Sequence, residues 1–472
     1  MAEFLSLFSG WLWGNLLYLL LGGGFFFAVF SRFSPFRYLG HGLTLLLGKK
    51  VEQDAPGEVS HFRALCSALS GTVGMGNVAG VAVAITQGGP GAIFWMWVCA
   101  LLGMATKFYT CSLAVMYRGK DENGVEQGGP MYFIREGLGE KWKPLAIFFA
   151  ACGMFGCLPL LQSNQLTQIV NTMFFEPQGW FVGSDSTTQV GNALFGLLLA
   201  VLVGMVVVGG IKRIGAFASR LVPGMVLLYG GTSLVIIFLH ADQIFPSLSL
   251  ILSDAFTGQA VAGGALGMVI VTGVRRAAFS NEAGAGSASI AHSAVKTKYS
   301  ASEGLVALLE PFIDTVVICT MTALVIIIFN TGGEQFNYGG DGTGAVVING
   351  ESFEGAGITS KAFAEYIPYS NVFLTVAVVL FAVSTMISWS YYGLQSWKFL
   401  FGRSKAADLS YKLLFCIFVV IGSAANMSSV WGFSDAMIFA MVFPNMVGLF
   451  FLFPVVKQQL NRYLEAIRAS KA

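Results

Sequence analysis

The stretch Ser70-Gly71-Thr72-Val73-Gly74-Met75-Gly76-Asn77-Val78-Ala79-Gly80 interrupts an apolar run that is otherwise long enough to cross a membrane. Three glycines within six residues make a poor continuous helix, because each glycine destabilises a helix by about 1 kcal/mol relative to alanine. A broken helix frees backbone N–H and C=O groups, which inside a membrane must be satisfied by protein, water or a ligand. The stretch therefore predicts a broken transmembrane helix at a binding site. Close packing against a neighbouring helix is the alternative explanation of these glycines.

The composition of the whole chain is that of a membrane protein. Of its 472 residues, 55% are hydrophobic and only 11% are charged, whereas a soluble domain carries roughly 25% charged residues. The net charge of +2 does not indicate a nucleic acid or another polyanionic partner. The seven cysteines lie in apolar stretches without metal-ligand or disulfide spacing, which indicates packing residues.

Apolar runs of about 20 residues, separated by polar loops, predict an all-α polytopic protein with eleven transmembrane helices in the lipid bilayer. The helices are expected near 11–31, 64–86, 91–117, 144–172, 191–211, 218–240, 262–291, 304–329, 363–392, 410–425 and 432–456. The first run is long enough to remain as a span rather than to be cleaved as a signal peptide. Residues 38–47 predict a short amphipathic surface helix, and residues 330–360 predict an irregular external loop.

The distribution of basic residues supports this count. With eleven spans, the loops on one side contain Arg32, Arg37, Lys49, Lys50, Arg63, Arg118, Lys120, Arg135, Lys141, Lys143, Lys212, Arg213, Arg220, Lys296, Lys298, Lys398, Arg403, Lys405, Lys457, Arg462, Arg468 and Lys471. The loops on the opposite side contain only Lys361. Because basic loops stay in the cytoplasm, the pattern predicts a multi-pass protein of the cell (inner) membrane with its N-terminus outside and its C-terminus in the cytoplasm.

An internal repeat connects the second and seventh spans. An offset of 204 residues aligns Asn77 with Asn281, Ala79 with Ala283, Gly80 with Gly284, Ala84 with Ala288 and Phe108 with Phe312. The two spans cross the membrane in opposite directions, as in transporters built from inverted repeats. We therefore expect a first five-helix repeat over 64–240 and a second over 241–456. A segment with one extra helix, 1–63, precedes them, and a cytoplasmic tail, 457–472, follows.

Several longer motifs resemble the alanine/glycine:cation symporter family, also called the sodium:alanine symporters, over nearly the whole chain. They are Gly74-Met75-Gly76-Asn77-Val78-Ala79-Gly80-Val81-Ala82, Gly88-Gly89-Pro90-Gly91-Ala92, Phe94-Trp95-Met96-Trp97, Gln127-Gly128-Gly129-Pro130-Met131-Tyr132, Phe279-Ser280-Asn281-Glu282-Ala283-Gly284, and Ser384-Thr385 with Trp389, Tyr391, Tyr392 and Gly393. The resemblance implies a leucine-transporter-like core of ten helices. It also implies Na⁺-coupled symport of small neutral amino acids, alanine or glycine, by alternating access.

The resemblance implies a substrate site at the two broken spans. The backbone N–H groups of Met75 and Gly76 would face the substrate carboxylate, Thr72 would add a hydroxyl, and Gly74 would permit a close approach. A break in span seven, over Val274 to Phe279, would supply carbonyl groups for the substrate ammonium.

Two further spans contribute to the expected site. The polar run at 162–165 lies in an otherwise apolar span, and we expect Gln162 to contact substrate. An interhelical hydrogen bond is the alternative role for Gln162. Trp389, together with Phe279 and Met75, would wall the pocket and exclude large side chains.

The sister family of neurotransmitter:sodium symporters is similar at the Gly74-Met75-Gly76-Asn77 segment and implies a sodium site. Its ligands here would be the carbonyl groups of Ser70 and Val73, a carbonyl near Phe381, and the hydroxyls of Ser384 and Thr385. Oxygen atoms suit a hard cation, although both hydroxyls could instead bond back to their own helix. A second Na⁺ at Asn77 is a further possibility.

Charged residues inside spans are functional by default. Those that lie in or near the spans include Lys107, Arg275, Arg276, Glu282, Glu310 and Asp314. For Lys107 and Glu310, which are near the cytoplasmic halves of their spans, snorkelling to the interface or pairing at a gate is the alternative to a transport role. Arg275 and Arg276 could pair with Glu282 or gate the transport path, and the sequence does not decide between these roles. A proton-coupled carrier that uses Glu282 is the alternative to sodium coupling.

Other classes of function are less well supported. The four histidines are scattered, and the chain contains no His-Glu-x-x-His or Gly-x-Ser-x-Gly motif of a hydrolase. No Gly-x-x-x-x-Gly-Lys-Ser/Thr loop for ATP is present. A channel is less expected than a carrier, because paired broken helices suit alternating access. The sequence therefore predicts a transporter and not an enzyme.

Overall fold

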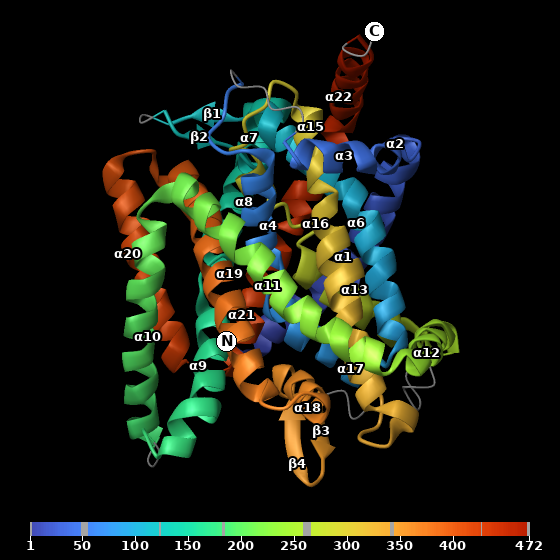
Figure 1. Ribbon diagram of the computed structural model, residues 1–472. Coiled ribbons are helices and arrows are strands. Elements are labelled where there is room, and N and C mark those ends of the chain that lie inside the picture. Colours follow the sequence, from blue (N-terminus) through green and yellow to red (C-terminus); the bar gives the residue numbers. More distant parts are fainter. Residues whose placement is uncertain are drawn as a thin grey trace.

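The structure, a computed structural model, is a bundle of helices (Figure 1). It describes residues 2–48, 55–121, 124–181, 185–257, 266–339, 344–425 and 427–469. Within these ranges the strands form only two short hairpins, and every long element is a helix. The predicted helical architecture is therefore confirmed.

Seven helices in the described ranges run for 20 residues or more without interruption. They are α1 (Ala2–Phe30), α6 (Gly91–Met116), α10 (Asp185–Val207), α11 (Gly210–Leu239), α19 (Ser370–Phe401), α20 (Lys405–Ala424) and α22 (Val442–Ala469). Their continuous apolar sequences make them stable in hydrocarbon, where a helix satisfies its own backbone groups.

Other helices are interrupted or irregular. They are α4 (His61–Thr72) with η1 (Gly76–Gly80) and α5 (Val81–Gly88), α8 (Lys143–Gly156) with α9 (Leu160–Val170) and η3 (Asn171–Phe175), α13 (Leu266–Asn281) with α14 (Ser289–His292), α15 (Ser300–Ala307) with α16 (Leu309–Pro311), η6 (Phe312–Cys319) and α17 (Thr320–Phe329), and α21 (Met427–Ala440). Three of these segments, η1, η3 and η6, are π-helical. Such segments are frequent at functional sites.

Short elements cover the two ends of the bundle. The helices are α2 (Ser34–Arg37), α3 (Leu39–Leu46), α7 (Pro130–Leu138), α12 (Ile244–Thr257) and α18 (Ala356–Tyr366), with single turns η2 (Glu140–Trp142), η4 (Glu176–Gln178), η5 (Ala241–Gln243) and η7 (Thr331–Gly333). The strands are β1 (Gly119–Lys120), β2 (Glu126–Gln127), β3 (Ala345–Ile348) and β4 (Glu351–Glu354), and both hairpins are antiparallel.

Eight helical segments of the described chain are long and apolar enough to cross a membrane, and α4 with α5, bent by 52°, would form a ninth. Two predicted spans are not among them. In α1 the apolar segment with described side chains is Leu16–Phe30, and the described part of the seventh predicted span begins at Leu266, so that α13 has 16 residues. The number of eleven spans therefore stays a prediction.

The spans differ in how far they are enclosed by protein. In Gly91–Met116, 83% of the most apolar window is buried, compared with 33% in Thr187–Val207 and in Lys405–Ala424. These last two segments, in α10 and α20, pack against each other at the edge of the bundle (Figure 1). Leu194, Leu197 and Val201 on α10 are more than half exposed. This apolar surface indicates contact with lipid.

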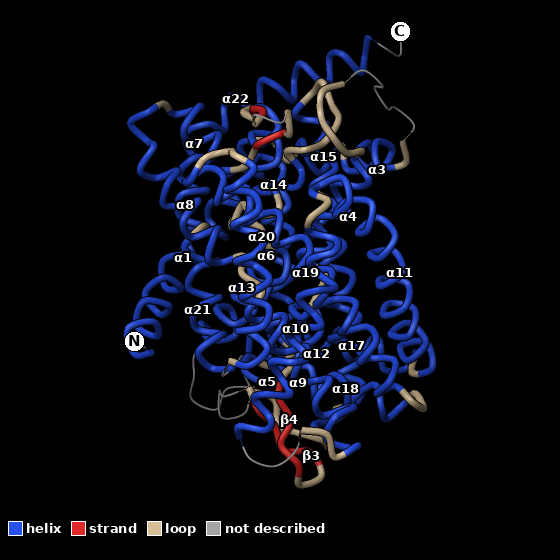
Figure 2. Tube along the Cα trace, turned by 90° about the vertical axis from the view of Figure 1, so that its left-hand side faces the viewer, coloured by secondary structure: helices blue, strands red, loops and turns tan. Residues whose placement is uncertain are grey.

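The basic loops meet at one end of the bundle, the end that carries β1, β2, α7 and the C-terminus (Figures 1 and 2). A nitrogen of the Arg403 guanidinium lies 2.8 Å from the Lys120 carbonyl oxygen. Arg118 donates to the Ser293 carbonyl oxygen at 2.8 Å. We call this end the basic end.

Near the basic end, helix α3 confirms the predicted helix at 38–47. A Cβ at Gly42 would lie 2.4 Å from the Leu305 carbonyl oxygen, so α3 packs directly on α15.

The opposite end carries the β3–β4 hairpin and α18 (Figures 1 and 2). The prediction of an irregular loop over 330–360 is therefore wrong. Asn349 and Gly350 join the strands with φ of 53° and 85°, and an Asn-Gly pair with positive φ is the preferred tight hairpin turn. Thr359 of α18 donates to the Val78 carbonyl oxygen at 2.9 Å, which fixes α18 over η1.

Candidate functional site

The first interruption lies within the glycine-rich stretch, where the sequence predicts it. Helix α4 ends before Val73, which is extended with φ −72° and ψ 100°. The Gly74 N–H donates to Asn77 Oδ1 at 2.7 Å, and the Asn77 N–H donates to the Gly74 carbonyl at 3.1 Å. The first N–H groups of a new helical arm have no intrahelical partner. Here those groups belong to Met75 and Gly76.

Two glycines at this break allow close contacts with other helices. A Cβ at Gly74 would lie 2.8 Å from the Thr385 hydroxyl oxygen of α19. A Cβ at Gly76 would lie 3.2 Å from the Cα of Ser280 in α13. Both distances are shorter than ordinary van der Waals contact, so larger residues would push α13 and α19 away from the break.

The second interruption lies later than predicted. Helix α13 continues to Asn281, and the chain is irregular until α14 begins at Ser289. The φ angles of Glu282, Gly284 and Gly286 are 51°, 99° and 85°. The predicted break over 274–279 is therefore wrong. The glycines that tolerate positive φ follow Asn281 rather than precede it.

This shift separates two residues that were expected to act together. Val274 is buried inside continuous α13, where a carbonyl is already bonded to a later N–H. Phe279 lies in the last turn of α13, where carbonyl groups lack intrahelical partners. Its ring packs beside Leu160 and Leu161 of α9. The contact of Phe279 with the substrate therefore stays a prediction, whereas Val274 does not lie at the break.

Trp389 of α19 connects the two interruptions. Its indole N–H donates to Glu282 Oε1 at 2.9 Å, and the Ser287 hydroxyl donates to the other carboxylate oxygen. A Cβ at Gly71 would lie 3.4 Å from the indole ring. Trp389 and Glu282 are 4% and 2% exposed. Trp389, which was predicted to wall the pocket, therefore also holds Glu282, the acidic residue of the second break.

Oxygen atoms gather between α4 and α19 at the predicted sodium site. The Ser384 hydroxyl lies 2.9 Å from the Phe381 carbonyl oxygen and 3.4 Å from that of Ser70. The Thr385 hydroxyl is buried, and it has no hydrogen-bond partner among the described residues. The Val73 carbonyl stands at the extended end of α4. This set of neutral oxygens fits a hard monovalent cation.

Asp314 of η6 is a buried acid to which sequence reasoning assigned no partner. Asn77 donates to Asp314 Oδ1 at 2.7 Å. Ser280 and Thr315 donate to Oδ2 at 2.7 and 2.8 Å. The carboxylate is fully buried, so these three donors stabilise it. Its position inside a predicted span was a signal, but only the fold identifies Asn77 as its neighbour.

Asn281, the counterpart of Asn77 in the repeat, makes matching contacts. It donates to the Thr315 hydroxyl at 3.0 Å, and its side-chain oxygen accepts the Ala283 N–H at 2.9 Å. Each asparagine therefore braces one interruption against η6.

The polar run of α9 divides between structure and site. Asn164 donates to the Gly422 carbonyl at 2.9 Å, an interhelical bond. The side-chain oxygens of Gln162 and Gln165 are buried without a hydrogen-bond partner among the described residues. Both amides are therefore available to a polar ligand. Sequence reasoning selected Gln162 but not Gln165.

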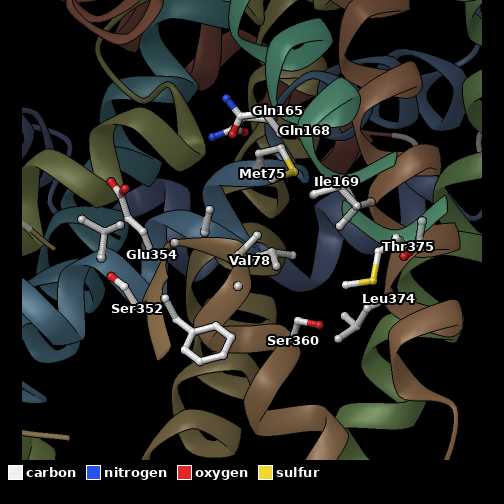
Figure 3. Close-up of a pocket in the computed structure, with 18 residues that line it drawn as sticks. Met75, Val78, Gln165, Gln168, Ile169, Ser352, Glu354, Ser360, Leu374 and Thr375 are labelled. Atoms are coloured by element: carbon white, nitrogen blue, oxygen red, sulfur yellow. The ribbon is translucent and has the colours of Figure 1, made fainter. Parts of the chain in front are cut away.

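A cavity of about 420 Å³ lies between the first break and the hairpin end (Figure 3). Figure 3 shows Met75 and Gln165 along one side, and Ser352, Glu354 and Ser360 along the other. Gln162 is not among the residues that line this cavity. Of the residues predicted to bind substrate, Met75 lines this cavity.

Among the remaining predicted residues, Thr72 is engaged within its own helix. Its hydroxyl donates to the Ala68 carbonyl oxygen at 3.3 Å. The other predicted residues lie on α4, η1, α9, α13 and α19. Contacts connect α13 with η1, and α19 with both α4 and α9.

Comparisons with known proteins match this arrangement. The sequence model of the sodium:alanine symporter family matches residues 1–472 of this chain. AgcS of Methanococcus maripaludis, a sodium/alanine symporter, is 37% identical, and the match covers 100% of this chain and 99% of AgcS. GlnT of Bacillus subtilis, a probable sodium/glutamine symporter, is 32% identical over 98% of this chain and 90% of GlnT.

A solved structure supports the leucine-transporter-like fold. MhsT, crystallised with L-phenylalanine, superposes with a TM-score of 0.59 at 12% identity, covering 84% of this chain and 90% of MhsT. At this identity the likeness concerns the fold alone. The family and the two named relatives are transporters rather than enzymes. The chain belongs to the sodium:alanine symporter family of membrane amino-acid transporters.

Proposed function

We propose that this protein imports a small neutral amino acid, alanine or glycine, together with Na⁺ across the cell membrane by alternating access. The observation that carries the proposal is the break at Gly74, where a new helical arm begins beside the Thr385 hydroxyl, which has no hydrogen-bond partner among the described residues. The first N–H groups of such an arm, at Met75 and Gly76, have no partner within the helix. The N-terminus of a helical arm attracts a carboxylate through its N–H groups and its dipole. A carboxylate is common to all amino acids.

In this proposal the substrate lies between the two interruptions. Met75 and Gly76 bind its carboxylate through their backbone N–H groups, and Gly74 permits the approach. The carbonyl of Phe279, at the end of α13, accepts from the ammonium. The side-chain oxygen of Gln162, which has no hydrogen-bond partner among the described residues, supports a second contact of this kind.

The first sodium ion would be bound by the oxygens of Ser70, Val73, Phe381, Ser384 and Thr385. Together they supply three carbonyls and two hydroxyls, which are oxygen ligands of the kind a hard cation prefers. The Ser384 hydroxyl donates to the Phe381 carbonyl of its own helix at 2.9 Å and lies 3.4 Å from the Ser70 carbonyl oxygen, so these oxygens are close enough together to share an ion.

We also propose a second sodium ion at Asn77. The Asn77 side-chain oxygen already accepts the Gly74 N–H. The neighbouring Asp314 carboxylate supplies the negative charge that would favour a cation there.

We also propose the predicted architecture of two five-helix inverted repeats, 64–240 and 241–456. The segment 1–63 precedes them, and the tail 457–472 follows. The matching braces of Asn77 and Asn281 support the repeat. The gathering of basic loops at one end supports a cytoplasmic C-terminus and an N-terminus outside.

Uptake into proteoliposomes tests the central proposal. Purified protein should accumulate radiolabelled alanine and glycine when Na⁺ is higher outside, and it should not do so when choline replaces Na⁺. A parallel arm with only a pH gradient tests proton coupling. Excess unlabelled alanine, but not glutamine, should suppress the uptake. If no cation gradient drives uptake of either amino acid, the proposal is wrong.

Trp389→Ala tests the substrate size limit. Removing the indole enlarges the space beside Gly71, so larger amino acids such as glutamine should begin to compete for uptake. Trp397→Ala, eight residues further along α19, is the control and should leave the selectivity unchanged. Unchanged selectivity in Trp389→Ala would show that this residue does not limit substrate size.

A further inference from the structure

Five ionisable side chains form a continuous hydrogen-bonded chain that the proposed transport site does not use. His61 contacts Glu303 Oε2, and His292 Nδ1 lies 2.5 Å from Glu303 Oε1. His292 Nε2 lies 3.3 Å from Glu310 Oε2, and Lys107 Nζ lies 2.8 Å from Glu310 Oε1. The chain joins α4, α15, α14, α16 and α6.

The chain leads from the basic end to the second interruption. His61 is the first residue of α4 and is 9% exposed. Glu303, His292 and Glu310 are 0% exposed, so they have no contact with water. At the inner end, Lys107 donates to the Asn281 carbonyl oxygen at 2.9 Å. His61 is therefore the member of the chain nearest to solvent.

The geometry at His292 requires one additional proton. A neutral histidine between two ionised carboxylates does not have enough protons for both contacts. Both ring nitrogens of His292 face carboxylate oxygens, but a neutral imidazole has a single N–H donor. In a neutral ring, the lone pair of the second nitrogen would face the lone pair of a carboxylate oxygen, and the two would repel each other. Imidazole is a stronger base than a carboxylate, so the added proton belongs on the His292 ring.

Charge counting leads to the same state. Lys107 contributes one positive charge, and Glu303 and Glu310 contribute two negative charges. Protonated His292 brings the buried cluster to neutrality, which low-dielectric surroundings favour. His61 then stays neutral and donates one N–H to Glu303, as its contact requires.

Other ionisable groups lie near the cluster and have contacts of their own. Arg118 of α6 lies near Glu303 and pairs with Glu126 at 3.8 Å. Cys111 of α6 is a buried thiol. Glu282 accepts from Trp389 and Ser287.

The remaining nearby acid, Asp314 of η6, has three hydrogen-bond donors of its own, as described above. It therefore does not depend on the cluster for its stabilisation.

We propose that His292 binds one proton between Glu303 and Glu310, and that His61 is the port through which this proton exchanges with the basic end. The two histidines contact different oxygens of Glu303, which makes a relay possible. Neutral His61 first takes a proton from water on Nε2, and the resulting imidazolium gives its Nδ1 proton to Glu303 Oε2. Rotation of the now neutral carboxyl group turns this proton toward His292 Nδ1, which takes it. Glu303 is then again ionised and His61 again neutral.

The relay crosses a helix boundary that alternating access would move. His61 belongs to α4, and its partner Glu303 belongs to α15. Separation of these helices would disconnect the port and trap the proton on His292. Only this last step rests on the proposed transport function.

Nitrogen NMR of ¹⁵N-histidine-labelled protein tests the bound proton without any transport measurement. The chain has four histidines, so at most four ring systems need assignment, by single substitution of each. In detergent without sodium or substrate, His292 should show two protonated ring nitrogens at pH 8. A neutral His292 ring at that pH would overturn the proposal, whichever carboxylate held the proton.

The port is tested by the rate at which the His292 signal responds to a pH jump. His61→Gln should slow this response about tenfold, which corresponds to about 1.4 kcal/mol in barrier height. His41→Gln is the matched control, because His41 also lies near the basic end and bonds Tyr463 instead. Equal rates in His61→Gln and the wild type would exclude His61 as the port.

A charge-balanced pair of variants separates proton binding from simple packing. His292→Gln leaves an uncompensated buried charge and should lower the unfolding temperature by about 5 °C or more. The double variant His292→Gln with Glu303→Gln restores neutrality and should regain part of this loss. Further destabilisation in the double variant would contradict the charge count. Both proton tests can fail while sodium-driven uptake persists, so the two proposals are distinguishable.

Discussion

The two interrupted segments, α4–η1–α5 and α13–α14, are built on the same brace but differ in what fills them. In both, an asparagine accepts a backbone N–H of the break and donates to η6: Asn77 to Asp314, and Asn281 to Thr315. The offset that aligns the two asparagines in the sequence therefore also relates their contacts. A local brace of this kind holds irregular backbone in place inside a membrane.

The first break contains no charged residue from 70 to 80, whereas the second contains Glu282. Side chains occupy the second break, because Trp389 and Ser287 bind Glu282 and Asn445 donates to the Gly284 carbonyl at 2.7 Å. At the first break the Thr385 hydroxyl has no hydrogen-bond partner among the described residues, and the first N–H groups of the new helical arm have no partner within the helix. We infer that the first break receives the ligand and that the second supports it.

Gly74→Ala tests whether the first break receives the ligand. The added methyl would lie 2.8 Å from the Thr385 hydroxyl oxygen, which would have to turn away from the break. We expect sodium-driven alanine uptake in proteoliposomes to fall by about 100-fold, or about 2.7 kcal/mol.

Gly80→Ala is its control on the same segment, since nothing lies within 4 Å of the added methyl. Equal losses in the two variants would mean that the break does not contact the ligand.

Asn77→Ala and Asn281→Ala test the shared brace. Asn77→Ala removes a donor from a buried carboxylate and should destabilise the protein by about 2–3 kcal/mol, because bonds to charged groups are stronger. Asn281→Ala removes a bond to a hydroxyl and should cost about 1 kcal/mol. Unfolding in detergent by denaturant measures both, and the reverse order would refute the assigned partners.

Trp389→Phe tests how the second break is held. It keeps most of the ring but removes the donor to Glu282, at an expected cost of about 2 kcal/mol in unfolding free energy. Trp95→Phe removes a comparable N–H donor to the neutral Ala255 carbonyl, 3.1 Å away, and should cost about 1 kcal/mol. Equal costs would indicate that Glu282 is not ionised.

Thr385→Ala probes the proposed sodium ligand, and we expect a smaller effect on uptake than that of Gly74→Ala. Losing one of five oxygens should raise the Na⁺ concentration for half-maximal uptake about tenfold, or about 1.4 kcal/mol. Ser388→Ala is the control, because it removes another buried hydroxyl, one turn later, that has no hydrogen-bond partner among the described residues. It should leave the Na⁺ concentration for half-maximal uptake unchanged. A sodium dependence that Thr385→Ala does not alter would remove Thr385 from the ion site.

Much of the fold and half of the site follow from local chemistry. Apolar length predicts helices in a membrane, and three clustered glycines predict the first break, because both depend on residues that are neighbours in the chain. The motifs also identified Trp389, Ser384 and Thr385, which the structure brings to the break. The Asn349-Gly350 turn was present in the sequence as a hairpin signal and was missed.

The other half required the tertiary structure. The second break lies at Glu282 rather than Val274, because the positive φ there is held by Trp389 and Ser287, which approach only in the folded bundle. The pairing of Asp314 with Asn77 joins residues 237 apart, and no sequence periodicity reports such a contact. The amino-acid sequence settled where helices form and where the first one breaks, since these are short-range properties of the backbone. Which buried polar groups satisfy one another was decided by the packing of distant segments, since a charge in the membrane is stable only beside its partner.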